Sequence, residues 1–251
     1  MNLTIDIGNT RTKIALFKEE KLLETQSLDQ ERELESFLDS HTGIRHIIFS
    51  TVGSPLDALQ THGSSVSVVH LDQDTPIPLE NKYETLGTLG ADRISNAVGA
   101  AHLYPKSNIL VIDAGTCITL DIVNEENQYL GGSISNGIQM RFQALNTFTE
   151  NLPLIGHENP DYPDLIGKST ESSIRSGVIN GVVAELCGMI SAYNKQFTGL
   201  KILLTGGDAN YIETELEDRI DSKKNEIFAD PNLVHIGLNA ILNFNVKKTS
   251  Q

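Results

Sequence analysis

Two short apolar runs in this chain end in the same polar pattern, and each is followed by a second β-rich run. Residues 3–5 lead into Asp6-Ile7-Gly8 and then into 13–17. Residues 109–112 lead into Asp113-Ala114-Gly115 and then into 118–123. Apolar runs joined by a tight polar turn predict a β-hairpin. Because the two copies lie nearly half the chain apart, we expect two similar halves rather than a short-period repeat.

Elsewhere the pattern alternates between strands and helices. Apolar runs predict further strands at 46–50, 66–71, 201–204 and 227–228, and helical spacing predicts helices at 30–40, from Asp92 to before Pro105, at 174–197 and at 233–244. This mixture predicts an α/β fold of two halves, each a mixed five-stranded sheet flanked by helices. We divide the chain into the halves 1–107 and 108–251. Because no linker is rich in Gly or Ser, we expect the two halves to meet along a cleft and not to swing freely.

The long helix predicted at 174–197 contains Gly177, Gly181 and Gly188. Glycine weakens a helix, so these positions predict close packing against another element. Cys117 falls in a predicted strand and Cys187 in this helix, and we interpret both as small core residues of a reducing compartment.

Composition narrows the possible partners. The chain has 251 residues, 39% of them hydrophobic, and a net charge of −14 at pH 7. That charge repels nucleic acid backbones and anionic membranes. No apolar run has the length of a membrane span and the N-terminus lacks the features of a signal peptide, so we expect a cytoplasmic protein. The seven histidines show no ligand spacing, so no transition-metal site is predicted.

The two acidic turns carry candidate chemistry. Gly8 and Gly115 have no Cβ, so a substrate phosphate can approach the backbone N–H groups there. Asp6 and Asp113 can hold a hydrated cation such as Mg²⁺, which binds through one or two carboxylates together with substrate phosphates. A single copy would be explained by turn geometry alone. Two copies at matched places favour phosphate handling.

Four motifs together point to one family. They are Asp6-Ile7-Gly8-Asn9-Thr10-Arg11-Thr12-Lys13, Gly90-Ala91-Asp92-Arg93, Asp113-Ala114-Gly115-Thr116 and Thr205-Gly206-Gly207. In this order, and over nearly the whole chain, the sequence resembles the type III pantothenate kinases of the acetate and sugar kinase/Hsp70/actin superfamily. The resemblance implies ribonuclease H-like (actin-like ATPase) halves and ATP-dependent phosphorylation of pantothenate to 4′-phosphopantothenate, the first step towards coenzyme A. It also implies a homodimer that needs Mg²⁺ and a monovalent cation, K⁺ or NH₄⁺.

The resemblance also assigns roles to single residues. Asp6, Ile7, Gly8, Asn9, Thr10, Arg11, Thr12 and Lys13 match the family's ATP-phosphate loop, and Thr116 matches an ATP contact. Gly90, Ala91, Asp92 and Arg93 match the pantothenate-binding stretch, with Asp92 as the general base. Asp113 matches the ligand of the monovalent cation, and Thr205-Gly206-Gly207-Asp208 resembles the adenosine motif. Tyr83 and Thr170 match substrate contacts, Thr170 reaching the partner subunit's site. Asn136 and Leu86 depart from the pattern, because the family usually has proline at both positions.

Each of these residues also has a purely structural interpretation. Asp92 suits a helix N-cap, Arg93 a surface ion pair and Thr170 a helix cap. Lys13 is by default a solvated lysine, and Tyr83 a packed loop aromatic. Two other functions stay open: another small-molecule kinase of the same superfamily, and a nucleotide-binding regulatory accessory factor that is not an enzyme.

Overall fold

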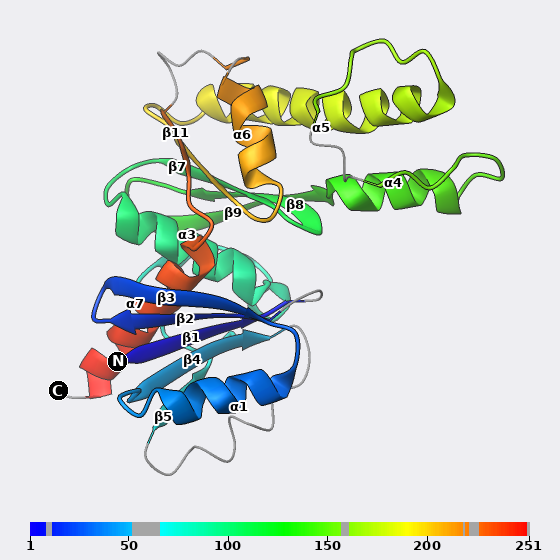
Figure 1. Cartoon of the computed structure of the whole chain (residues 1–251). Coiled ribbons are helices and arrows are strands. Elements are labelled where there is room, and N and C mark those ends of the chain that lie inside the picture. Colours follow the sequence, from blue (N-terminus) through cyan, green and yellow to red (C-terminus); the bar gives the residue numbers. More distant parts are fainter. Residues whose placement is uncertain (9–11, 52–65, 157–160, 218, 221–225, 250–251) are drawn as a thin grey trace. The chain divides into compact units, whose positions relative to one another are not determined.

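The computed structural model describes residues 1–8, 12–51, 66–156, 161–217, 219–220 and 226–249. The chain divides into two compact units, each containing one β-sheet and its helices (Figure 1). The first unit takes in 1–105, 127–129 and 232–251, and the second takes in 106–126 and 130–231.

The sheet of the first unit has the strand order β3-β2-β1-β4-β5. Its strands are β1 (Asn2–Ile7), β2 (Thr12–Lys18), β3 (Lys21–Leu28), β4 (His46–Thr51) and β5 (Ser67–His70). β1 is central: it runs antiparallel to β2 and parallel to β4. This register places Asp6 between Lys13 on one neighbouring strand and Ser50 on the other. The first predicted hairpin is therefore present, and the site residue Asp6 lies at the end of the central strand.

Alternation along β1 decides which helix covers each face of this sheet. Leu3 and Ile5 point into an apolar cluster with Leu34 of α1 (Glu31–Ser40), and all three side chains are fully buried. Thr4 points to the opposite face, where its hydroxyl meets His235 of α7 (Leu233–Thr249). Figure 1 shows α1 and α7 on opposite faces of the sheet. Successive side chains of β1 therefore point to opposite faces, and both faces of the sheet are covered.

Two glycines allow α7 to pack closely on α3 (Ala91–Leu103). A Cβ at Gly237 of α7 would overlap the carbonyl group of Ser95 on α3, and a Cβ at Gly99 of α3 would lie 2.6 Å from the carbonyl oxygen of Leu233. Neither obstacle can move easily, because both are helix backbone. This contact fixes the axis of α3, which carries Asp92 and Arg93 at its start.

The second unit repeats the strand arrangement of the first. Its sheet has the order β11-β10-β7-β8-β9, and β7 runs antiparallel to β8 and parallel to β10, as β1 does to β2 and β4. The strands are β7 (Ile109–Ala114), β8 (Cys117–Val123), β9 (Gln128–Asn136), β10 (Lys201–Thr205) and β11 (Glu226–Ala229). A sixth strand, the two-residue β6 (Glu80–Asn81), pairs with Gln128 and Tyr129 at the start of β9. The predicted fold class, two mixed sheets flanked by helices, is confirmed.

Three helices belong to this second unit: α4 (Ile138–Thr147), α5 (Thr170–Asn194) and α6 (Ala209–Glu217). α5 buries Val178, Val182 and Leu186 in the core of the unit. It is the one helix among the described residues that is long and apolar enough to cross a membrane by length and composition. A helix in a globular core can share both properties, and its buried face places α5 in such a core.

Three sequence-based expectations need comment. The prediction of close packing at Gly177, Gly181 and Gly188 is wrong within the described chain, since a Cβ at any of them would meet nothing within 4 Å. Cys117 is not a core residue: it is exposed at the first position of β8, while Cys187 is half-buried. The division at residue 107 stays a prediction, but α7 packs on α3 and β1, so residues 232–251 belong to the first compact unit.

Candidate active site

Asp6 is held at the end of β1 by a hydrogen bond from a neighbouring strand. Ser50, whose side chain is buried, donates from Oγ to Asp6 Oδ1 over 2.9 Å. Burial raises the pKa of Asp6 above its ordinary value, the Ser50 bond opposes this, and the nearby charge of Asp92 adds to it. Asp6 and Asp92 therefore lie near enough for their charges to interact.

The rest of the first hairpin lies beside Asp6. Ile7 pairs with Thr12, and Asp6 pairs with Lys13, whose exposed ammonium lowers the pKa of Asp6 slightly against the other influences. Gly8 is exposed after the strand. Asn9, Thr10 and Arg11, which were also assigned to the phosphate loop, lie outside the described residues.

The start of α3 presents Asp92 in a fixed pose. Gly90 is the N-cap residue, so Asp92 is the second residue of the helix and not its cap. Asp92 Oδ1 accepts a hydrogen bond from the backbone N–H of Arg93 over 2.8 Å and occupies the place where a Cβ at Gly90 would lie. A side chain at position 90 would therefore push the Asp92 carboxylate out of this pose. The carboxylate stays exposed, while the helix N-terminus favours its negative charge.

Arg93 is buried beside Asp92 and contacts Tyr83. Its side chain is only 5% exposed, and its guanidinium carbon lies 5.5 Å from the centre of the Tyr83 ring. Tyr83 is in turn 6.1 Å, ring centre to ring centre, from the buried Tyr129. A surface ion pair is thus the wrong interpretation for Arg93. The structure brings together Tyr83 and the 90–93 stretch, two segments whose association the resemblance alone had suggested.

Asp113 occupies in the second unit the place that Asp6 has in the first. It is the last residue but one of the central strand β7, and it pairs with Thr205 at the end of β10. Gly206 in that turn has φ +95° and lies so close that an added Cβ would be 2.5 Å from Asp113 Oδ1 and from the carbonyl oxygen of Ala114. Asp208 then donates its backbone N–H to the Ala114 carbonyl over 2.9 Å. The Thr205-Gly206-Gly207 motif therefore packs directly on the second acidic turn.

Thr116 lies in a turn that is closed on itself and supported from β9. The Gly115 N–H donates to the Cys117 carbonyl over 3.0 Å, and the Gly137 N–H donates to the Thr116 carbonyl over 3.2 Å. A Cβ at Gly137 would overlap the carbonyl oxygens of both Gly115 and Thr116. The Thr116 side chain is exposed. A ligand can therefore reach its hydroxyl, while its backbone is held in place.

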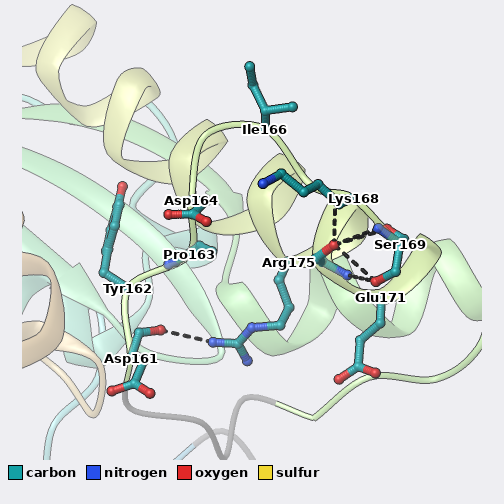
Figure 2. A pocket seen from close by; sticks show the side chains of 10 residues that line it. Asp161, Tyr162, Pro163, Asp164, Ile166, Lys168, Ser169, Glu171 and Arg175 are labelled. Carbon is teal, nitrogen blue, oxygen red and sulfur yellow. Dashed lines mark hydrogen bonds between the residues drawn. The ribbon is translucent and has the colours of Figure 1, made fainter.

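Thr170 is the exposed first residue of α5, and the cap of that helix is its neighbour Ser169, which forms a capping box with Ser172. A cavity of about 350 Å³ opens at this helix start (Figure 2). The buried Arg175 donates there to the carbonyl oxygen of Asp161 over 3.0 Å. The cavity is lined by none of the predicted active-site residues that the structure describes.

Ser50 is the site residue that the sequence did not reveal. It lies in an apolar run and carries no motif, and only the register of β4 against β1 brings it to Asp6. Within the part of the chain that is described, no three His, Cys, Asp or Glu side chains gather as a metal site.

Comparison with known proteins agrees with this arrangement. The family model described as type III pantothenate kinase matches residues 2–192. A protein of Christiangramia forsetii named type III pantothenate kinase is 45% identical over 98% of this chain and 99% of its own.

Two solved structures share the fold. One is a Campylobacter jejuni protein with the provisional description of a conserved Baf family transcriptional activator (TM-score 0.60, 22% identity, 98% of this chain and 99% of that one). The other is the activator of the 2-hydroxyisocaproyl-CoA dehydratase of Clostridium difficile with bound ADPNP (TM-score 0.57, 12% identity, 99% and 96%). At these identities they show the fold alone. By its family model and its relative of equal length, the chain belongs to the type III pantothenate kinase family.

Proposed function

We propose that this protein transfers the γ-phosphoryl group of ATP to pantothenate, giving 4′-phosphopantothenate for coenzyme A biosynthesis in the cytoplasm. Family membership makes it a phosphotransferase. The observation that carries the substrate assignment is at the start of α3, where an exposed carboxylate and a buried guanidinium occupy successive positions, Asp92 and Arg93. This pair suits a substrate that has an alcohol at one end and a carboxylate at the other.

Asp92 is the general base of the proposed reaction. Phosphoryl transfer needs positioning and charge neutralisation more than covalent chemistry. A carboxylate within hydrogen-bond reach of the acceptor hydroxyl takes its proton and contributes roughly 10²–10⁴-fold to the rate. The backbone bond from Arg93 holds one oxygen of Asp92 and leaves the other to face the alcohol. Gly90 and Ala91 let the substrate approach the start of the helix.

Arg93 binds the substrate carboxylate, and Tyr83 shapes the pocket around it. A guanidinium binds a carboxylate through two parallel hydrogen bonds, and burial strengthens the pair by excluding water. Tyr83 helps to hold the guanidinium in place through the cation–π contact at 5.5 Å. Thr170 reaches the substrate of the partner subunit in this proposal.

ATP is bound by residues 6–13 of the first hairpin and by Thr116 of the second. Asp6 fits a hydrated Mg²⁺ for two reasons. Ser50 orients its carboxylate, and a cation would relieve the repulsion between the charges of Asp6 and Asp92. Mg²⁺ when bound neutralises phosphate charge. Asp113 offers a carboxylate oxygen beside the backbone of Gly206, a donor set of oxygens that fits K⁺ or NH₄⁺.

We further propose that the enzyme is a homodimer assembled through α5. The face of α5 that carries Gly177, Gly181 and Gly188 is open in the single chain. A second helix can approach this face closely, because glycine has no side chain to hold it away. Large apolar side chains are also exposed in the second unit, Phe148 at 83%, Leu165 at 77% and Ile166 at 75%. Analytical ultracentrifugation should give a dimer for the wild type and a monomer for Gly181→Glu. A monomeric wild type at micromolar concentration would refute this arrangement.

An acceptor screen separates the candidate functions. ATP consumption is measured with pantothenate, sugars and acetate, for the wild type and for Asp92→Asn. We expect turnover with pantothenate alone, and a loss of roughly 10²–10⁴-fold in kcat for the variant at unchanged thermal stability. Turnover with a sugar or acetate instead would favour another small-molecule kinase. A protein that binds nucleotide but turns over none of these acceptors would favour the regulatory function.

A further inference from the structure

A network of polar side chains surrounds the end of β9 in the second unit. Arg141 of α4 forms an ion pair with Glu185 of α5, with Nη2 and Oε2 2.6 Å apart. Glu185 accepts a second hydrogen bond, from Ser135 Oγ to Oε1, over 2.7 Å. Arg141 also donates from Nε to the backbone carbonyl of Asn136 over 2.8 Å. One arginine therefore ties together β9, α4 and α5.

This network ends on the turn that supports Thr116. Asn136 precedes Gly137, whose N–H is donated to the Thr116 carbonyl and whose Cα lies against the Gly115 and Thr116 carbonyls. A displacement of the 136–137 backbone would therefore move Thr116. Asn136 does not restrict its own φ as proline would, so the constraint on this turn must come from elsewhere.

The charges in the network favour a fixed geometry. Burial alone raises the pKa of Glu185, but the hydrogen bonds from Arg141 and Ser135 outweigh it, so the pKa lies below its ordinary value. The carboxylate is thus ionised at neutral pH and holds the planar guanidinium. The side chain of Arg141 is 23% exposed and that of Glu185 is 34% exposed. An ion pair buried to this extent is stronger than one on the surface.

We propose that Arg141 is a positioning residue for ATP binding, acting through the Asn136 carbonyl and the Gly137 turn on Thr116. This inference rests on the proposed function, since it takes Thr116 as an ATP contact. Glu185 and Ser135 are the anchor that sets the orientation of the guanidinium. Arginine suits this place because its Nε and Nη2, held in one rigid plane, bond the Asn136 carbonyl and Glu185 at once, whereas lysine offers a single flexible ammonium.

The test is a comparison of Michaelis constants in the full-length enzyme, supported by direct titration with a fluorescent ATP analogue. Arg141→Ala should raise the KM for ATP about tenfold, the effect of losing one charge-assisted hydrogen bond. The KM for pantothenate should change less than about twofold. Tyr83 and the pantothenate residues of α3 belong to the other unit, and Thr170 is the first residue of α5, far along that helix from Glu185. Arg141→Lys keeps the ion pair with Glu185 and should fold as the wild type does, yet still raise the KM for ATP.

The controls separate positioning from stability. Arg219→Ala removes another ion pair of the same unit, Arg219–Glu215 at 3.2 Å, and should leave both Michaelis constants unchanged. The side chain of Arg219 contacts Glu215 and Tyr162, which are not part of the turn. Arg141→Ala/Glu185→Ala should resemble Arg141→Ala alone, since both residues act through one bond.

Three results would overturn the inference: a wild-type KM for ATP in Arg141→Lys, equal changes in both Michaelis constants, or a loss of kcat alone. If the wild type itself does not phosphorylate pantothenate, the proposed function fails. The titration with the ATP analogue then still decides whether Arg141 positions a nucleotide site.

Discussion

Replacing the buried histidine of α7 should change how the fold responds to acid. His235 is 2% exposed, and its Nδ1 lies 2.8 Å from the hydroxyl of Thr4 in the central strand β1. Burial, with a smaller effect from the charge of Lys13, lowers the pKa of His235 to about 4 from an ordinary value of 6.5. The imidazole is therefore neutral in the folded protein at any pH where the enzyme would work.

The sign and size of the effect follow from proton linkage. Between pH 6.5 and about pH 4 the unfolded chain binds a proton at residue 235 that the folded chain does not. Stability from this residue is complete above pH 6.5 and is lost as the pH falls towards 4. The difference between the two pKa values corresponds to about 3 kcal/mol of unfolding free energy.

The assay is urea unfolding at a series of pH values from 7.5 to 4. Wild type should lose about 3 kcal/mol more over this range than His235→Gln, which has no ionisable group at the position. Carboxylates also titrate in this range, but they are common to both proteins and cancel in the comparison. His102→Gln, at an exposed position of α3, serves as the matched control and should follow the wild type. Parallel losses in wild type and His235→Gln would refute the reasoning.

Three further changes test single parts of the structure. Ser50→Ala should weaken the affinity for the Mg²⁺–ATP complex about tenfold, because it removes the hydroxyl that orients Asp6. Ser67→Ala, on the exposed edge of the same sheet, should leave this affinity unchanged. Nucleotide titration with and without Mg²⁺ measures the affinity of both variants. Asp113→Asn should abolish the activation by KCl that we expect of the wild type, and an unchanged KCl response would argue against a cation ligand there. Gly237→Ala should cost roughly 1–3 kcal/mol in chemical unfolding, because the added Cβ overlaps a carbonyl of α3, and unchanged stability would contradict that contact.

Much of the fold could be predicted because its information is local. The apolar runs at 3–5 and 109–112 mark two strands, and the polar turn after each marks a hairpin. The same topology around β1 and β7 bears out the repeat seen in the sequence. Strand β6 has only two residues, so no periodic pattern could reveal it.

What the sequence could not show depends on contacts between distant residues. α7 has an ordinary helical pattern, and nothing in it indicates that Asn2 and Thr4 at the other end of the chain supply its partners. The roles of Ser50 and Arg141 likewise depend on strand register and on one backbone carbonyl.

Within the site, the sequence predicted where Asp92 lies in the chain's secondary structure, but not how deeply Arg93 is buried or what it contacts. Asp92 was expected at the start of a helix and is found there, and Gly90 takes the cap position that Asp92 could have filled. The burial of Arg93 against Tyr83 had no local signal, because the two lie in different segments. The open face of α5 shows the converse: glycines that predict a close neighbour have none within the single chain.

The most direct test of the central claim is ³¹P NMR of the purified protein incubated with ATP, Mg²⁺, KCl and pantothenate. We predict that the γ-phosphate signal of ATP decreases while a phosphomonoester signal of 4′-phosphopantothenate grows in equal amount. ADP accompanied only by inorganic phosphate, or no change in the ATP signals, would contradict the account.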